Sequence, residues 1–454
     1  MPASELKVFG LGLARKILTR LSEILATEFP TNTPEELGRI IQRIIDFIIS
    51  VLNSNDDERI LKYVCQYLQE LSSHLRYIEG ASSARIPTSI ITPLEVLIEQ
   101  MEPGARVMLR VQSSYNYEIF DIIAFYRKML DELVGTELDV ILGSTPHLYI
   151  VAVPAVEHSN ILLHTLLAHE AGHRIARKYM DSEDQEAVVN NINTLMGTDL
   201  RWWDREAETL PPLLKLELRQ RIFDLIHRAR ASALKELISD AVAYHLCGVS
   251  AIFAMDDFCC TDVLDARPEE AYGFYPPWRY RLRQLVSMAY ADNFHEAVKL
   301  ITGPVPLVKI RDAVGERFSR LREITLQTPD CTLIDGDRLL QRAYSDIPEV
   351  LEKASEYISH EVAGLRYSHA KLSEEIPALL ERLSLGIPPD TRDGEVVDIR
   401  SALAAGWFYR TARLPMPNDE GRHWQPKDDE VLNRLVLKAI EATQLVRDFR
   451  AGTT

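Results

Sequence analysis

The segment His169-Glu170-Ala171-Gly172-His173 has the residue types and the spacing of a metal-dependent hydrolytic site. Residues i and i+4 share one face of a helix, so both imidazoles can reach a single metal ion. Glu170 follows the first histidine directly and is expected to face a water molecule on that ion as a general base. Zn²⁺ lowers the pKa of bound water from about 15.7 to about 7, which supplies a nucleophile for an amide carbonyl.

A hydrolytic zinc site needs a third protein ligand and an open fourth position. Two histidines and a glutamate also fall at this spacing by chance on ordinary amphipathic helices, and the chain has twelve histidines. Glu236 is the best candidate for the third ligand, because it lies in a second helical pattern over residues 233–244. Asp240, one helical turn later, is expected to accept the free ring N–H of a ligand histidine. Apolar residues surround both acids, which a solvent-exposed helix would not require.

The combination of HExxH at residues 169–173 and Glu-Leu-Ile-Ser-Asp at residues 236–240 resembles the gluzincin metallopeptidases. The interval between the two motifs is longer than in thermolysin and more similar to the connections in the neprilysin class and in the CAAX-prenyl-protease and heat-shock-protease type. Tyr275-Pro276-Pro277, followed by Arg281, is similar to the His-Pro-Pro stretch and arginine of that type, with tyrosine in place of histidine. This resemblance covers roughly residues 107–285. It implies Zn²⁺ as the cofactor, a glutamate of a second helix as third ligand, and hydrolysis of peptide bonds.

The resemblance gives Arg281 two alternative roles near the metal. Its guanidinium is expected either to stabilise negative charge on the substrate oxygen or to anchor Asp240. Tyr275 or Tyr244 is expected to contribute a phenol to the same stabilisation. The competing interpretation is that the three arginines at alternate positions 279–283 lie on a solvent-exposed surface.

Three further histidines are weaker candidates for the site. His164 lies nine residues before His173, and His245 lies nine residues after Glu236. Nine residues on a regular helix are half a turn out of phase, so neither is expected to face the metal. His147 precedes a predicted strand and is interpreted as an ordinary histidine at a strand end.

The predicted strand over residues 148–153 is rich in β-branched and aromatic residues and is flanked by Pro146 and Pro154. Proline is tolerated better at a sheet edge than in a central strand, so the sequence predicts an edge strand. Such an edge could bind an extended peptide substrate through main-chain hydrogen bonds. The alternative is an edge with a purely structural role.

Composition restricts the class of protein. There are 51 Lys and Arg against 67 Asp and Glu, with a net charge of -16, which argues against a nucleic-acid partner bound through phosphates. The N-terminal region lacks the features of a signal peptide, and charged residues interrupt the most apolar run at 40–52, so no membrane span is expected. Five cysteines without a disulfide pattern favour free thiols and a cytoplasmic location.

The pattern of elements predicts an α+β fold that is predominantly helical. Residues 1–83 are expected to form an N-terminal helical region, with helices at 4–26, 34–52 and 57–78. Thr33 is predicted to cap the second of these, with Pro34 at its first position and Glu36 completing a capping box. Residues 84–302 are expected to form a zincin-like catalytic core with a small sheet, and residues 303–454 a C-terminal helical region.

Within the core, the sequence predicts a strand from Val107, a helix at 117–133, the strand at 148–153 and the helix of the first motif. A polar connection containing Trp202-Trp203 is expected over residues 181–212. The C-terminal helices are expected at 307–326, 336–365, 370–385 and 429–450, with Pro348 opening a separate helix.

Two functions of different classes agree with these observations. The first is a zinc peptidase that acts on a protein or peptide substrate. Its helical flanks either restrict access until a regulatory partner, a ligand or the substrate opens the site, or only complete the core or form an oligomer interface. The second is a non-catalytic interaction or scaffold protein that keeps the zincin fold. Glu170 favours catalysis, because a scaffold does not need a carboxylate beside the open metal position.

Overall fold

The computed structural model describes residues 2–134, 138–143, 146–199, 209–259, 264, 275–326, 346–416 and 423–452. These residues form a predominantly helical α+β structure with one three-stranded and one two-stranded sheet, as the sequence predicts at this level. The chain divides into two compact units, Met1–Ile161 and Leu162–Thr454. Their boundary falls inside the region 84–302, and the division into three regions stays a prediction.

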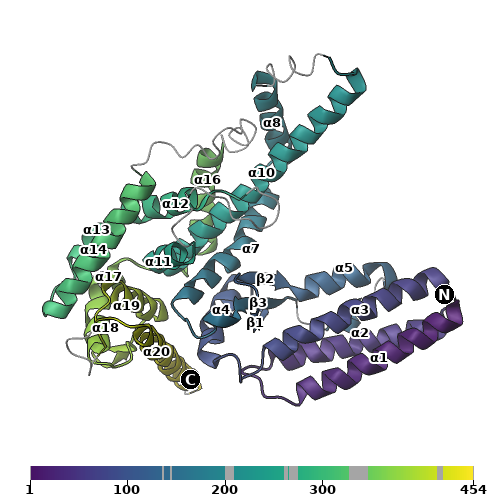
Figure 1. Cartoon of the computed structure of the whole chain (residues 1–454), viewed down its shortest axis with the longest axis horizontal. Helices are drawn as coiled ribbons and strands as arrows, with labels where there is room; N and C mark the ends of the chain where they lie inside the picture. Colours follow the sequence, from purple (N-terminus) through teal and green to yellow (C-terminus); the bar gives the residue numbers. More distant parts are fainter. Residues whose placement is uncertain are drawn as a thin grey trace. The chain divides into compact units, whose positions relative to one another are not determined.

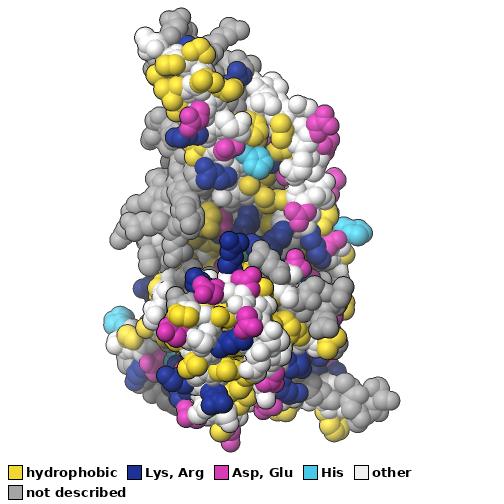
Figure 2. Space-filling model, turned by 90° about the vertical axis from the view of Figure 1, so that its right-hand side faces the viewer, with side chains coloured by type: hydrophobic (Ala, Val, Ile, Leu, Met, Phe, Trp, Pro, Cys, Tyr) yellow, Lys and Arg dark blue, Asp and Glu magenta, His cyan; other side chains and the backbone are white. Residues whose placement is uncertain are grey.

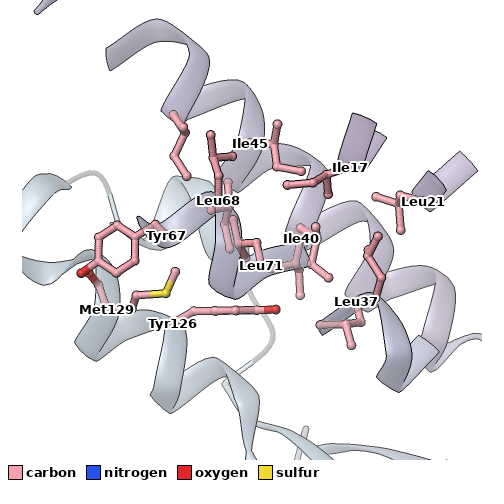
Figure 3. Close-up of a cluster of buried hydrophobic side chains, with 14 of the residues drawn as sticks. Ile17, Leu21, Leu37, Ile40, Ile45, Tyr67, Leu68, Leu71, Tyr126 and Met129 are labelled. Atoms are coloured by element: carbon pink, nitrogen blue, oxygen red, sulfur yellow. The ribbon is translucent and has the colours of Figure 1, made fainter. Parts of the chain in front are cut away.

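The first unit contains the three predicted N-terminal helices, followed by three shorter ones. They are α1 (Ala3–Leu25), α2 (Thr33–Ser54), α3 (Glu58–Gly80), α4 (Thr88–Met101), α5 (Ile122–Val134) and α6 (Leu138–Leu142). Apolar residues recur at helical spacing on α1, α2 and α3 and form one buried cluster with Tyr126 and Met129 of α5 (Figure 3). This amphipathic spacing made the helices predictable from the sequence.

The start of α2 is predicted to within one residue, but its capping residue is predicted wrongly. The helix begins at Thr33, one residue before the predicted start at Pro34, and has proline in its first turn as predicted. The cap residue is Asn32, which has αR backbone angles and makes no side-chain capping bond. Because the chain already turns helically at Asn32, Thr33 lies inside the helix instead of at the extended position that a capping side chain needs.

The three-stranded sheet has the order β1-β3-β2 and consists of β1 (Arg106–Gln112), β2 (Glu118–Asp121) and β3 (Leu148–Pro154). β3 pairs in parallel with β1 and antiparallel with β2, so it is the central strand and the prediction of an edge strand is wrong. Pro146 precedes the strand and Pro154 is its last residue, so neither interrupts the pairing. The predicted helix at 117–133 begins only at Ile122, because its first residues form β2.

The first helices of the second unit include the two that carry the motifs. They are η3 (Leu163–Leu166), α7 (Leu167–Ser182), α8 (Gln185–Asp199), α10 (Pro212–Cys247), α11 (Val249–Phe258), α12 (Trp278–Ala291) and α13 (Phe294–Lys299). α10 packs along α7, and its C-terminal half is buried (Figure 1). The connection predicted at 181–212 contains the helix α8, and Trp202-Trp203 lies outside the described residues.

The remaining elements of this unit are also mainly helical. They are α14 (Val305–Leu326), α16 (Ile347–Glu361), α17 (Ala370–Glu374), α18 (Ile376–Ser384), β4 (Thr391–Arg392), β5 (Glu395–Val396), α19 (Ile399–Ala412) and α20 (Pro426–Gly452). Pro348 lies in the first turn of α16, as predicted, whereas residues 336–345 of that predicted helix lie outside the described residues. The single helix predicted at 370–385 is two helices, and the proline in the first turn of α18 favours this break.

No helix of the described part of the chain is both long and apolar enough to cross a lipid bilayer. Figure 2 shows acidic and basic side chains interspersed on one face, so the acidic excess does not collect there in a single patch. Cys65, Cys247 and Cys259 are buried, and Cys65 and Cys247 are free, whereas Cys260 and Cys331 lie outside the described residues.

Candidate metal centre

The first turns of α7 bring His169, Glu170 and His173 together. One potential ligand atom of each lies within 4.8 Å of the others. The centroids of the two imidazole rings are 4.7 Å apart. The buried residues of this helix include Leu167, Ala171, Gly172 and Ile175, and their packing fixes the rotation of α7 about its axis. The spacing of the motif therefore places the three side chains as the sequence predicts.

Gly172 allows α10 to pack directly on this part of α7. A Cβ atom at this position would lie 2.9 Å from both Cα and the carbonyl oxygen of Ser239, and 3.1 Å from Cβ of Val242. Most of this space is occupied by backbone atoms, which cannot rotate away. The close approach of the two backbones is what lets short side chains of α10 reach the histidines of α7.

Glu236 of α10 adds a carboxylate to the two histidines. Its Oε2 lies 3.4 Å from Nε2 of His169, and its Oε1 lies 3.8 Å from Nε2 of His173. Two ligand atoms on a tetrahedral Zn²⁺ with bonds of 2.0–2.1 Å are about 3.3 Å apart, so the first distance agrees and the second is somewhat longer. Oε2 of Glu170 lies 3.7 Å from Nε2 of His173, so this carboxylate also borders the same ring nitrogen.

The second ring nitrogen of each histidine contacts a polar atom of α10. Nδ1 of His169 is 2.7 Å from Oδ1 of Asp240, the contact expected from the sequence. Nδ1 of His173 is 2.8 Å from Oγ of Ser239, a contact that the sequence analysis missed. With both Nδ1 atoms bound in this way, both Nε2 atoms face the Glu236 carboxylate, and three nitrogen and oxygen donors converge on one position.

Arg281 of α12 lies directly beside these residues, with its Nη2 3.4 Å from Nδ1 and 3.5 Å from Nε2 of His169. Its Nε donates to Oδ2 of Asp240 at 2.8 Å and its Nη2 donates to Oδ1 at 2.7 Å. Nη1 is 3.3 Å from Oε2 of Glu236, and the guanidinium lies over the ring of Trp278. Only 3% of Arg281 is exposed, so the interpretation of a solvent-exposed arginine is wrong. The contacts match the expected anchoring of Asp240.

The buried charges shift the pKa values of the two glutamates. Burial raises the pKa of Glu170 to about 7, although the neighbouring His169 opposes this shift. Burial would also raise the pKa of Glu236, but the Arg281 charge and the hydrogen bond with His169 hold it well below its usual value. At neutral pH, Glu236 is therefore an anion suited to bind a cation, whereas Glu170 exchanges a proton easily.

The two histidines shift in opposite directions. Burial alone would lower the pKa of His169, but the charge and hydrogen bond of Asp240 raise it to about 9. Burial and the positive charge of His169 lower the pKa of His173 to about 3. A metal ion would therefore have to displace a proton from His169 and would find His173 already neutral.

Other residues considered in the sequence are engaged elsewhere. The Tyr244 hydroxyl donates to Oδ2 of Asp292 at 2.9 Å, and its predicted catalytic role stays a prediction. Tyr275 is half-buried just before α12, and its predicted role stays a prediction. His147 is 2.6 Å from Asp121 through Nδ1, beside the start of β3, in keeping with a strand-end histidine.

The helical phase argument holds for one of the two remaining histidines. His245 lies in the same regular helix as Glu236 and is buried, and neither ring nitrogen has a hydrogen-bond partner among the described residues. His164 lies in η3, a 3-10 helix that precedes α7, so the assumption of one regular helix from 164 to 173 is wrong.

No family model, no curated protein and no solved structure matches this chain.

Proposed function

We propose that this chain is a zinc-dependent peptidase with a zincin-like core, in which His169, His173 and Glu236 bind the metal ion. The observation that carries the proposal is the convergence of two Nε2 atoms on one carboxylate, at 3.4 and 3.8 Å. Zinc is favoured because two histidines and a glutamate are a known catalytic ligand set for this ion. When bound, the ion would polarise the scissile carbonyl and lower the pKa of water.

Glu170 is the proposed general base. Its carboxylate accepts a proton from the attacking water and returns this proton to the leaving amine of the peptide. A pKa of about 7, raised by burial, suits both steps, because the same group must bind and release the proton near neutral pH. Arg281 holds Asp240, and Asp240 in turn orients His169, so we assign both to positioning.

The substitution Glu170→Gln tests catalysis against a scaffold function. The amide has the same shape but cannot accept the proton, so we expect retained fold and zinc with loss of hydrolysis. Zinc content is measured by elemental analysis after dialysis, and hydrolysis with a library of quenched fluorescent peptides. Glu186→Gln, at an exposed position of α8, is the control and should behave as wild type.

Two results would count against the proposal. Wild-type protein that keeps no zinc after dialysis would remove the metal centre. A Glu170→Gln variant that still hydrolyses peptides at the wild-type rate would remove the general base. If the Glu170→Gln variant kept the full biological effect of the wild-type protein, the result would instead support the non-catalytic interaction protein. The cytoplasmic location, the regulatory partner and the gating role of the helical flanks stay predictions from the sequence.

A further inference from the structure

Ser239 is fully buried in α10, directly before Asp240. Its Oγ is 2.7 Å from the carbonyl oxygen of Lys235 and 2.8 Å from Nδ1 of His173. A carbonyl oxygen only accepts hydrogen bonds, so the hydroxyl hydrogen points to Lys235. The lone pairs of Oγ then face His173, and Nδ1 of this histidine must carry the hydrogen that completes the second bond.

We propose that Ser239 is a positioning residue that holds His173 in the tautomer with hydrogen on Nδ1 and a free lone pair on Nε2. This inference rests on the proposed metal site. Nε2 of His173 faces Glu236 at 3.8 Å and Glu170 at 3.7 Å, the side on which the metal ion would lie. The other tautomer would point an N–H group at the ion and could not bind it.

The two ligand histidines are thus held by chemically different partners. His169 donates to the Asp240 carboxylate, which Arg281 neutralises. His173 donates to a neutral hydroxyl. A second carboxylate at position 239 would place another negative charge among buried acids, where Arg281 already pairs with Asp240 and Glu236, and such a charge is costly to bury. A serine fixes the tautomer without adding charge.

The backbone contact at Gly172 makes this hydrogen bond possible. Gly172 precedes His173, and the Cα atom of Ser239 lies where a Cβ of residue 172 would begin to overlap it. A serine side chain extends only one atom beyond Cβ, so it reaches the imidazole only when the two helices are this close. The hydrogen bond between Ser239 and His173 therefore depends on the close packing of α7 and α10 as well as on the serine hydroxyl.

Nitrogen NMR of the metal-free wild-type protein tests the tautomer directly. With ¹⁵N-labelled histidine, the two ring nitrogens of a neutral imidazole give separate signals that identify which one carries the hydrogen. The His173→Gln variant identifies the signals of His173 by their loss. We expect hydrogen on Nδ1, and hydrogen on Nε2 would overturn the proposal even if zinc binds.

Substitution of the serine tests its effect on the metal. Ser239→Ala should lower zinc affinity about 10–100-fold, as measured by competition with a chelator, because the partner that orients a ligand is lost. Ser250→Ala is the control, since Ser250 is also fully buried in this unit, in α11, and its Oγ has no partner among the described residues. Its zinc affinity should equal that of wild type.

The outcomes separate this inference from the proposed function. Equal zinc affinity of wild type and Ser239→Ala would overturn the positioning role while leaving the metal site intact. Absence of zinc binding in wild type, together with hydrogen on Nδ1 of His173, would refute the proposed function while supporting the tautomer assignment.

Discussion

Replacing Gly172 by alanine is expected to weaken metal binding at the proposed centre more than the fold. The added Cβ would lie 2.9 Å from Cα and from the carbonyl oxygen of Ser239. Ordinary van der Waals contact begins at 3.4 Å, so the shortfall is 3.4 minus 2.9, or 0.5 Å. Because backbone atoms occupy the space, α7 and α10 themselves would have to separate by about this amount.

Two effects of opposite sign determine the change in stability. Added atoms in a well-packed interior typically cost about 1–3 kcal/mol. Alanine in a helix interior is more favourable than glycine by about 1 kcal/mol. The net expectation is a loss of about 0–2 kcal/mol in the free energy of unfolding. The protein should therefore still fold, and its metal binding can be measured.

The effect on the site is larger because the site spans the two helices. The bond from His173 to Ser239 would lengthen from 2.8 Å to about 3.3 Å, beyond the usual range for a hydrogen bond. Glu236 would move away from both histidines with the rest of α10. We expect zinc affinity to fall about 10–100-fold, the loss usually seen when a supporting partner of a ligand is removed.

Gly315→Ala in α14 is the matched control. A Cβ there meets no described atom within 4 Å, so the variant should gain up to about 1 kcal/mol and bind zinc as wild type does. Urea denaturation gives the stability, and chelator competition gives the affinity. The reasoning is refuted if Gly172→Ala is stabilised as much as Gly315→Ala and keeps wild-type zinc affinity.

Three further outcomes are expected. Glu236→Ala should lose stoichiometric zinc in elemental analysis, and one retained zinc per chain would exclude Glu236 as third ligand. Arg281→Met should lose about 3–5 kcal/mol in urea denaturation, because Asp240 would be left as a buried charge without its partner, whereas wild-type stability would contradict the ion pair. Burial and the charge of Arg76 lower the pKa of His74 to about 4, against 6.5 when exposed. Between pH 6.5 and 4 the unfolded chain binds more protons than the folded chain. The free energy of unfolding therefore decreases as the pH is lowered through this window, by about 3 kcal/mol in total. His74→Gln should flatten this dependence, and an unchanged slope would contradict it.

Local spacing made part of the structure predictable. The N-terminal helices follow from apolar residues that recur every three or four positions. The grouping of His169, Glu170 and His173 follows from positions along one helix, and so does the closeness of Glu236 to Asp240. To predict the contact of Asp240 with His169, it was also necessary to assume that the two motifs lie on facing helices.

Features that depend on tertiary packing were missed or wrong. β3 is central because it pairs on both sides, while its flanking prolines indicated an edge. The role of Ser239 needs the distance between two helices, which no spacing within one helix reveals. A signal was present in Gly172, since a glycine inside a helical motif often marks a close backbone approach, but its partner could not be identified from the sequence.

The buried charges of the site are balanced without a metal ion. Glu236 and Asp240 are anions, Arg281 is a cation, and His169 carries a proton because its pKa is raised to about 9. These four formal charges sum to zero when Glu170 is protonated, as it is below pH 7. Because net charge is costly to bury, this balance stabilises the metal-free fold and keeps the donors in place.

A divalent ion changes the balance in a way that involves Glu170. A bound divalent ion would replace the proton of His169. Glu236 and Asp240 would then contribute two negative charges, Arg281 one positive charge and the ion two, which gives a net charge of plus one. Ionisation of Glu170 returns the sum to zero, and the ionised carboxylate is the form that accepts a proton from water. The formal charges of a purely structural ion-pair network would sum to zero without Glu170. Burial of Glu170 would then only destabilise the fold. The presence of this carboxylate beside the candidate ligands therefore supports the proposed catalytic role over a purely structural one.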